Sequence, residues 1–177
     1  GYNIFNPALI GRAFLMATFP VLMTTWLKPH ALDVVTGASP LGLMKFQGEA
    51  TTFMKLFIGN VSGSLGEPST LALLIGAAYL FIRRIIDWRI PLAYLGTVFL
   101  LTGILYLLNP KINPDPLWHI LAGGLLFGAF FMATDLVTTP VTKAGRWLFG
   151  FGCGIFLFII RTWGGLPEGV MYSILLM

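Results

Sequence analysis

The sequence predicts an all-α integral membrane protein with about five to six transmembrane or broken helices. Hydrophobic residues make up 56% of the 177 residues, charged residues make up only 10%, and the mean hydropathy is +0.84. An ordinary soluble domain has about 25% charged residues, so the 18 charged side chains here are too few to cover a surface exposed to water. The 21 glycines and 11 prolines divide the apolar sequence into segments of unequal length.

Three segments are long enough to cross a bilayer, which takes about 20 apolar residues. Ala8–Leu27 contains Arg12 one turn from its start and Pro20 in its middle, which predicts a kinked span with Arg12 near one interface. Ile90–Leu108 carries no formal charge and is the clearest predicted span. Leu117–Ala133 is the third candidate.

The remaining apolar segments have about 12 to 14 residues each, fewer than the roughly 17 to 25 that a span needs. They are Thr70–Ile82, Trp147–Ile160 and Leu166–Met177. Each adjoins a motif of Gly, Pro and polar residues, namely Ser62–Glu67, Ala133–Pro140 and Trp163–Glu168. We interpret them as broken helices of the kind found in transporters, because irregular backbone at membrane depth must be buried in protein or line a cavity. Interfacial loops between short tilted helices are the alternative.

The composition also argues against several classes of site. The net charge of +4 comes from scattered cations, so we expect no nucleic-acid partner. Cys153 is the one cysteine, which excludes an internal disulfide, and its Gly-rich surroundings predict close helix packing. Without a Cys pair or a His cluster, we expect no metal, haem or iron–sulfur centre held by this chain alone.

We expect residues 1–177 to form a single membrane domain that is part of a longer protein, because Gly1 is not an initiator residue and the sequence stops within an apolar stretch. Two short loops are basic, one with Arg83, Arg84 and Arg89, the other with Lys143 and Arg146. Cytoplasmic loops are rich in Lys and Arg, so we place both of them in the cytoplasm. Arg12 then falls on the cytoplasmic side, and the loop of residues 28–50 faces outward.

This outward loop contains the sequence Asp33-Val-Val-Thr36-Gly37-Ala38-Ser39-Pro40. An Asp that accepts backbone hydrogen bonds, hydroxyl side chains, a Gly with positive φ and a terminating Pro are typical of a turn, and this is the simplest interpretation. The small Gly37 and Ala38 leave the Ser39 hydroxyl open to a large reagent. The lysines of the region favour an anion nearby, and they are Lys28, Lys45 and Lys55.

The same sequence resembles the flavinylation motif Asp-x-x-Ser/Thr-Gly-Ala-Ser/Thr, at which a flavin transferase attaches FMN through a phosphoester to the last hydroxyl, here that of Ser39. The usual residue at this position is Thr, and both side chains present a hydroxyl. Other segments resemble motifs of the RnfD/NqrB family in the same order, and they are Gly1–Phe14, Ser64–Glu67, Phe131–Asp135, Val137–Pro140, Gly145–Trp147 and Leu166–Val170. The likeness is nearest to the RnfD members and corresponds to their C-terminal half, with Asp135-Leu136 in place of the more usual Asp-Pro.

The resemblance implies one half of a urea- or ammonium-transporter-like inverted repeat. It also implies a subunit of an ion-translocating oxidoreductase, without an independent active site on this chain. In an Rnf complex, electrons pass from ferredoxin through iron–sulfur and flavin centres to NAD, while Na⁺ or H⁺ is exported. The implied location is the bacterial or archaeal cytoplasmic membrane, and the implied partners are the other Rnf subunits (A, B, C, E and G), membrane lipid and a flavin transferase.

The implied cofactor is FMN attached to Ser39, with Asp33, Thr36, Gly37 and Ala38 as the rest of the motif. The resemblance is also compatible with a non-covalent riboflavin. Two alternatives stay open. The first is an NqrB-type subunit of a Na⁺-translocating NADH:quinone reductase, which shares the fold and the flavinylation. The second is a non-redox channel with the urea-transporter-like fold, in which Ser39 only belongs to a turn.

Glu67 and Asp135 are candidate ion-pathway residues, because acidic groups beside short helices at membrane depth are functional candidates. Solvated loop carboxylates, or partners of the loop arginines, are the alternative. Oxygen atoms that can bind a cation or serve in helix packing are those of Asn6, Thr134, Thr138 and Thr139. We expect His119, next to Trp118, to be an interfacial anchor. Phe127–Met132 either packs against lipid or walls a flavin pocket.

Overall fold

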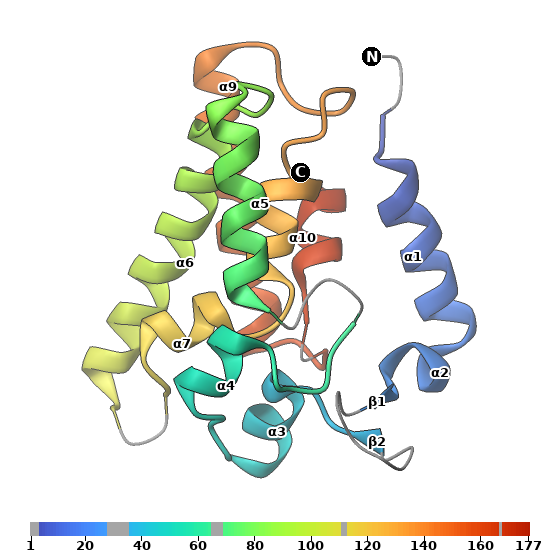
Figure 1. The fold of residues 1–177 in the computed structure, drawn as a ribbon, viewed down its shortest axis with the longest axis vertical. Coiled ribbons are helices and arrows are strands. Elements are labelled where there is room, and N and C mark those ends of the chain that lie inside the picture. The colour runs from blue at the N-terminus through green and yellow to red at the C-terminus, as the bar shows by residue number, and fades with distance from the viewer. Residues whose placement is uncertain (1–3, 28–35, 65–68, 111–112, 167) are drawn as a thin grey trace.

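The computed structural model describes residues 4–27, 36–64, 69–110, 113–166 and 168–177 (Figure 1). Within these ranges the regular structure is helical apart from one antiparallel ladder, in which β1 (Trp26–Leu27) pairs with β2 (Thr36–Gly37). The helices are α1 (Pro7–Thr18), α2 (Pro20–Thr24), α3 (Pro40–Gln47), α4 (Phe53–Ile58), α5 (Thr70–Ile82), α6 (Arg89–Leu108), α7 (Pro116–Leu121), α8 (Leu125–Phe127), the π-helical η1 (Gly128–Met132), α9 (Lys143–Thr162) and α10 (Val170–Leu176).

Among the described residues, α6 and α9 are long and apolar enough to cross a membrane. Each has 20 residues, which at about 1.5 Å per residue gives roughly the 30 Å of a hydrocarbon core. Both helices begin at the end of the molecule that carries the two basic loops, and both run toward the end that carries α3, α4 and α7 (Figure 1). The basic loops and α3 therefore lie at opposite ends of the bundle.

Glycines bring α9 unusually close to α6. A Cβ at Gly150 would lie 2.6 Å from the Cβ of Ala93, and a Cβ at Gly154 would lie 2.6 Å from the Cβ of Thr97. The two glycines are four residues apart, so they share one face of α9, as in the small-residue interfaces of membrane helices. Cys153 is fully buried beside them, which confirms the predicted packing role of its surroundings.

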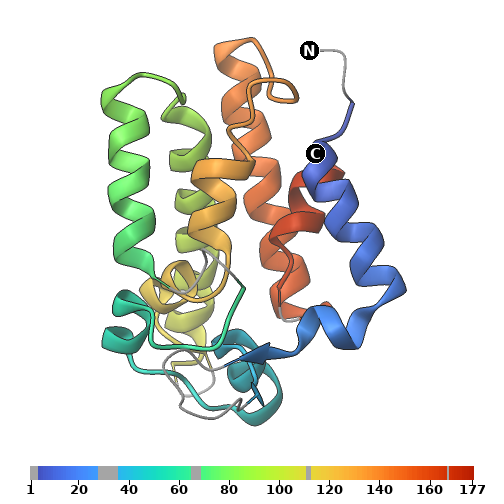
Figure 2. The same ribbon diagram turned by 45° about the vertical axis from the view of Figure 1, so that its right-hand side comes forward.

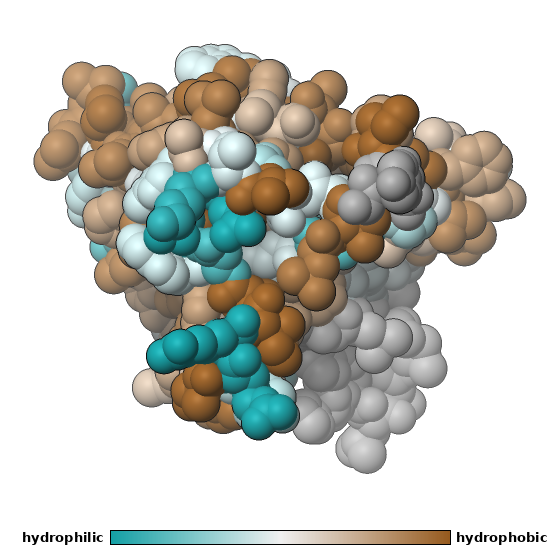
Figure 3. Space-filling view, turned by 90° about the horizontal axis from the view of Figure 1, so that it is seen from above, coloured by the Kyte–Doolittle hydropathy of each residue, from teal (hydrophilic) through white to brown (hydrophobic). Residues whose placement is uncertain are grey.

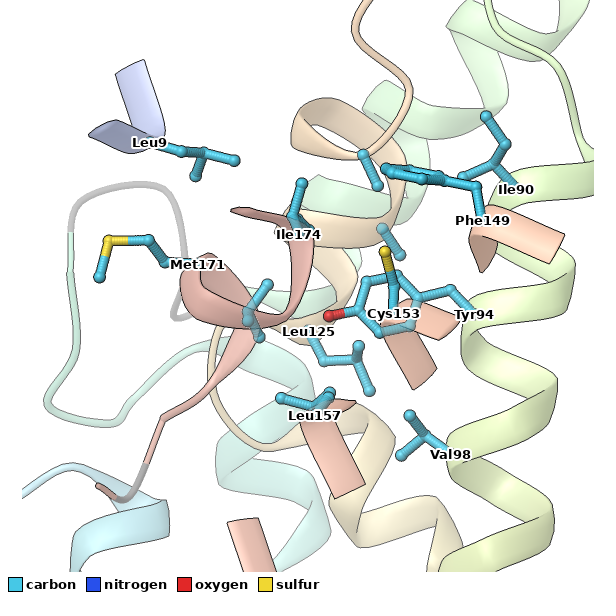
Figure 4. Packing of buried hydrophobic residues seen from close by; sticks show 13 residues of the cluster. Leu9, Ile90, Tyr94, Val98, Leu125, Phe149, Cys153, Leu157, Met171 and Ile174 are labelled. Atoms are coloured by element: carbon cyan, nitrogen blue, oxygen red, sulfur yellow. The ribbon is translucent and has the colours of Figure 1, made fainter. Parts of the chain in front are cut away.

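The main core lies between α6, α9, α10 and η1, and Figure 4 shows the side chains that fill it. Tyr94 projects from α6 and is fully buried. Its hydroxyl lies 2.6 Å from the Ser173 Oγ of α10, and this Oγ is also 2.8 Å from the carbonyl oxygen of Val170. A buried phenol without a partner is costly in an apolar medium, so this contact explains why two hydroxyls are tolerated in the core.

Hydrophobic side chains on the outside of the bundle are widely exposed. Ile82 on α5 and Leu107 on α6 expose 79% and 81% of their surface. α1 lies beside α10, on the other side of the bundle from α6, and presents further apolar residues outward (Figures 1 and 2). Apolar exposure on this scale is typical of surfaces covered by lipid or by another protein.

The predicted spans are confirmed in part. Ile90–Leu108 corresponds to α6, and Thr70–Ile82 has the same bounds as α5. The kink in Ala8–Leu27 is confirmed as well, because α1 ends at Thr18 and α2 begins at Pro20. A proline ring cannot continue the preceding helix without losing a hydrogen bond.

The prediction of one continuous span over Leu117–Ala133 is wrong. α7 ends at Leu121, and the chain turns through Gly123 before α8 and η1 begin. Gly123 has a φ of +72°, which only Gly adopts readily. A Cβ on Gly123 would also lie 2.3 Å from the Leu41 Cδ1 of α3. The break in this helix therefore lets α3 pack against exposed backbone.

The prediction that Trp147–Ile160 is a short segment is also wrong. α9 begins four residues earlier, at Lys143, and continues to Thr162. The Thr142 side chain caps its start by accepting a hydrogen bond of 3.1 Å from the Gly145 N–H. The basic residues of the first turn hide this extension from a search for apolar runs.

The two basic loops meet at one end of the molecule. The Asp87 carboxylate accepts a hydrogen bond of 2.8 Å from the guanidinium of Arg89 and a further one from the guanidinium of Arg146, which lies in the first turn of α9. Seen from this end, hydrophilic side chains form two groups on a largely hydrophobic surface (Figure 3). Burial raises the pKa of Asp87, but its hydrogen bonds with Arg89 and Arg146 outweigh burial and hold the pKa below its ordinary value.

Enlarging the glycine interface is expected to destabilise the bundle. Gly154→Val places atoms within the space of Thr97, and overpacking of this kind costs about 1–3 kcal/mol of unfolding free energy. The control is Gly96→Ala on α6, where a Cβ meets nothing within 4 Å. Thermal unfolding in detergent checks the prediction, and equal melting temperatures for the two variants would contradict it.

Acid is expected to weaken the contact between the basic loops. The folded-state pKa of Asp87 lies below the unfolded value of about 3.9, so its stabilisation is complete above that pH and is lost as the pH falls through the folded-state pKa. At pH 7, Asp87→Asn is expected to cost about 1.5–3 kcal/mol, the range for hydrogen bonds to charged groups. Melting temperatures of both proteins measured from pH 7 to pH 2 should converge at the acid end. A difference independent of pH would argue against this role for the carboxylate.

Candidate functional site

Ser39 stands at the start of α3. Its φ of −65° and ψ of 156° are those of an N-cap residue, and its Oγ accepts a hydrogen bond of 3.2 Å from the Gly42 N–H. Pro40 follows at the first helical position, where a missing N–H costs nothing. A Cβ on Gly42 would lie 3.3 Å from the Ser39 Oγ, closer than most real contacts. The absence of this Cβ keeps the space beside the hydroxyl open.

The chain before Ser39 is extended, so the turn interpretation of the motif is wrong for its second half. Thr36 and Gly37 form β2, with Gly37 opposite Trp26 and Thr36 opposite Leu27. Gly37 is not among the described glycines with positive φ. Asp33 lies outside the described residues. The ladder and the α3 cap together hold the two residues between them, Ala38 and Ser39.

Ser39 lines a cavity of about 340 Å³, a volume in the range of small-molecule sites. Its wall combines the α1–β1 region, α3, the segment from Gly124 to η1, and the start of α10. Aromatic and sulfur-containing side chains make up much of this wall, and they include Met16, Trp26, Phe127, Met132, Met171 and Tyr172. A flat apolar group attached at Ser39 would find matching surfaces here.

The Phe127–Met132 segment serves two surfaces. Phe127 and Met132 line the cavity, whereas Phe130 is buried. The ring of Phe130 packs edge-to-face against that of Phe81 on α5, with the two ring centroids 5.8 Å apart. The π-helical turn distributes these side chains over both faces. Neither of the two roles predicted for the segment therefore describes all of it.

Arg12 and Glu168 close one side of the cavity. The Arg12 Nη2 lies 3.2 Å from the Glu168 Oε2, and the Glu168 Oε1 accepts a hydrogen bond of 3.2 Å from the Gly124 N–H. Arg12 is therefore not at the end with the basic loops, as the orientation argument expected, but within the wall that also contains Ser39. Arg12 and Glu168 are 156 positions apart, and the sequence carries no signal of this pair.

Of the lysines predicted to attract an anion, the two that the structure describes, Lys45 and Lys55, do not line the cavity beside Ser39. The Lys45 Nζ donates to backbone carbonyls at the end of α9, including that of Arg161 at 2.9 Å. Lys55 is exposed on α4, and Lys28 lies outside the described residues. Among the described residues that line the cavity, Arg12 carries the positive charge.

Of the two candidate ion-pathway acids, the structure describes Asp135. Its sequence neighbours Thr134 and Leu136 line the cavity that Asp87 and Arg146 also line, and its Oδ2 accepts a hydrogen bond of 3.1 Å from the Thr138 hydroxyl. Glu67 lies outside the described residues. The structure thus gives Asp135 a local partner, and Asp135 is not among the residues that line the cavity beside Ser39.

Three of the four residues proposed to offer oxygen atoms to a cation, Asn6, Thr134 and Thr138, have local side-chain hydrogen-bond partners. Asn6 caps α1 by accepting from the Ala8 N–H at 3.0 Å, and Thr134 donates to the carbonyl of Phe130 at 2.6 Å. Thr139 lines the cavity beside the basic loops. No group of three or more metal-binding side chains occurs among the described residues.

Trp118 and His119 do not form the expected interfacial anchor. Trp118 is buried, and its Nε1 donates to the carbonyl of Thr51 at 2.9 Å. The carbonyl of His119 accepts a hydrogen bond of 2.7 Å from the buried guanidinium of Arg161. The two residues therefore connect α7 to the α3–α4 segment and to α9.

Known proteins are similar to this sequence over its whole length. The model described as the NQR2, RnfD, RnfE family matches residues 1–177. The D subunit of the proton-translocating ferredoxin:NAD(+) oxidoreductase complex of Clostridium ljungdahlii is 47% identical over 100% of this chain and 57% of its own length. The D subunit of the Na(+)-translocating ferredoxin:NAD(+) oxidoreductase complex of Acetobacterium woodii is 46% identical over 100% and 55%, respectively.

A relative from a second kind of complex is also similar. The B subunit of the Na(+)-translocating NADH-quinone reductase of Pseudomonas aeruginosa LESB58 is 39% identical over 99% of this chain and 46% of its own length. The chain thus spans about half the length of the curated relatives that it matches. The match to the family model is complete over this length, and the chain belongs to the NQR2, RnfD, RnfE family.

Proposed function

We propose that the chain is part of a membrane subunit of an Rnf-type ion-translocating ferredoxin:NAD⁺ oxidoreductase complex and that it carries FMN covalently on Ser39. The names of its relatives from Clostridium ljungdahlii and Acetobacterium woodii support membership of such a complex. The proposed partners are the other Rnf subunits, and a flavin transferase is needed for maturation.

The observation that carries the proposal is the position of Ser39. Its hydroxyl lies at the N-cap of α3, on the wall of the 340 Å³ cavity, and is partly exposed. Helix N-termini favour phosphate groups because their N–H groups and dipole are positive. The missing Cβ of Gly42 leaves room beside the oxygen that would carry the phosphoester.

The residues of the cavity fit the other parts of FMN. Trp26, Phe127 and Tyr172 offer aromatic surface to an isoalloxazine ring, and Arg12 offers a cation to its anionic groups. When bound, the flavin supplies the redox chemistry of the site. The side chains that line the cavity would hold the ring, exclude water from it and set the charge around it.

The direction of the long helices supports an outward-facing Ser39. α6 and α9 begin at the basic loops and run about 30 Å toward the α3 end. Basic loops stay in the cytoplasm, so the α3 end faces outward. A covalent tether retains a cofactor that could not be replaced from the cytoplasm. The broken α7–α8–η1 segment fits one half of an inverted repeat of the urea-transporter type.

A second candidate is an NqrB-type subunit of a Na⁺-translocating NADH:quinone reductase, which the relative at 39% identity favours. The two candidates share the attachment at Ser39 and differ in the soluble subunits that copurify. Additional riboflavin is part of either proposal and would be released on denaturation. In a non-redox channel, Ser39 would serve only as the cap of α3.

Removing the Ser39 hydroxyl is expected to abolish covalent flavin. The full-length subunit, expressed with a flavin transferase, should show an ultraviolet-excited fluorescent band after denaturing electrophoresis. Ser39→Ala should lose the band completely, and Ser39→Thr should keep it within about twofold, since both residues offer a hydroxyl. Ser64→Ala, on another serine of the cavity wall, is the matched control and should keep the band. A wild-type subunit without fluorescence would sink the proposal.

Neutralising the candidate pathway acids is expected to uncouple ion export from electron flow. Asp135→Asn or Glu67→Gln should lower the ions exported per electron at least threefold in sealed vesicles, while the fluorescent band on the subunit persists. An acidic group at membrane depth serves as a temporary cation partner, which an amide does not. Glu49→Gln removes an exposed acid of the α3–α4 loop and should leave coupling unchanged. Unchanged coupling in both pathway variants would remove these residues from the pathway.

A further inference from the structure

Lys45 lies in the last turn of α3, six residues after Ser39, and reaches the end of α9. Its Nζ lies 2.9 Å from the carbonyl oxygen of Arg161, 2.5 Å from that of Gly164 and 3.0 Å from that of Leu166. An ammonium group has three N–H donors, and these three short contacts use all of them. The fourth carbonyl within reach belongs to Ile160, at 3.4 Å, and already accepts a hydrogen bond from the Gly164 N–H.

The position of these carbonyls explains why they need a cation. The last carbonyls of a helix have no partner within the helix, and the helix dipole makes this end negative. α9 ends at Thr162, so Arg161, Gly164 and Leu166 direct their carbonyls into this region from the last turn and the segment that follows. Three convergent carbonyl oxygens form a site for an ammonium-type cation, and the Lys45 side chain fills it.

A second contact fixes the other end of α3. Leu41 packs so closely against Gly123 that a Cβ on this glycine would lie 2.3 Å from the Leu41 Cδ1. The turn at Gly123 is itself tied to α9, because the Arg161 guanidinium donates to the carbonyl of Ala122 at 3.2 Å. Lys45 and Leu41 thus connect α3 to the same end of α9 by two routes.

We propose that the carbonyls of Arg161, Gly164 and Leu166 form a cation site for a primary ammonium group, and that its occupation by Lys45 holds α3 with the Ser39 hydroxyl on the cavity wall. Lys45 is a positioning residue, because it acts on Ser39 through α3 and is not among the residues that line the cavity. This inference rests on the proposed function for its flavin readout only.

The test uses the full-length subunit in membranes from cells without the flavin transferase, to which purified transferase and its flavin nucleotide substrate are added. Lys45→Ala should lower the fluorescent band per folded subunit at least fivefold. Propylammonium chloride replaces the three methylenes and the amine that the variant lacks, so it should restore most of the band. Tetramethylammonium has no N–H donor and should restore nothing. Lys55→Ala, which removes an exposed lysine of α4, should behave as wild type.

A second readout needs no flavin. Ser39→Cys introduces a thiol at the start of α3, and the native Cys153 is fully buried and stays unlabelled. Adding Lys45→Ala should raise the labelling rate of the new cysteine by a maleimide at least threefold, and propylammonium should reverse the change. Lys45→Met keeps the apolar part of the side chain, and it replaces Lys45→Ala in this measurement if the alanine variant does not accumulate. It should show the same increase without recovery, because its side chain fills the space.

The two readouts separate the two proposals. If the wild-type subunit gains no fluorescence, the proposed function fails, and the labelling rates alone decide the role of Lys45. If the labelling rate and the band are unchanged in both Lys45 variants, or if propylammonium and tetramethylammonium act alike on Lys45→Ala, the cation site does not position Ser39.

Discussion

The close approach of α9 to α6 at Gly150 and Gly154 is the contact on which the rest of the fold depends. It packs two helices of 20 residues each against one another, with Gly150 beside Ala93 and Gly154 beside Thr97. Polar contacts then connect each end of α9 to neighbouring segments. At one end, Arg146 forms an ion pair with Asp87. At the other end, the Arg161 guanidinium donates to the carbonyl of His119 on α7, and Lys45 of α3 donates to the carbonyl of Arg161.

Several hydroxyl groups inside the bundle have hydrogen-bond partners within it. Thr97 and Thr102 donate to the carbonyls one turn earlier, and Tyr94 meets Ser173 across the core. Where a helix breaks, side chains replace the missing backbone partners, as Glu168 does for the Gly124 N–H. Lipid offers no such partners, so irregular backbone at this depth requires them. The cavity beside Ser39 lies where several of these breaks meet.

Composition and segment length were sufficient to predict the membrane class, the α6 span and the bounds of α5, because these depend on local apolar runs. They failed for Leu117–Ala133, whose break depends on the conformation of Gly123, and for Trp147–Ile160, whose first turn is basic. Ser39 was found through a motif. The partner of Arg12 was not, since a contact across 156 residues leaves no periodic pattern in one sequence.

The hydrogen bond at the start of α3 has a consequence for any chemistry at Ser39. The Oγ accepts from the Gly42 N–H, and the cap needs only the lone pairs of this oxygen. Replacing its proton by phosphorus leaves an oxygen that still has lone pairs facing the same N–H. The helix can therefore be built before the modification and does not have to be rebuilt after it. A side chain that is both structural cap and attachment point is compatible with maturation of a subunit that is already folded.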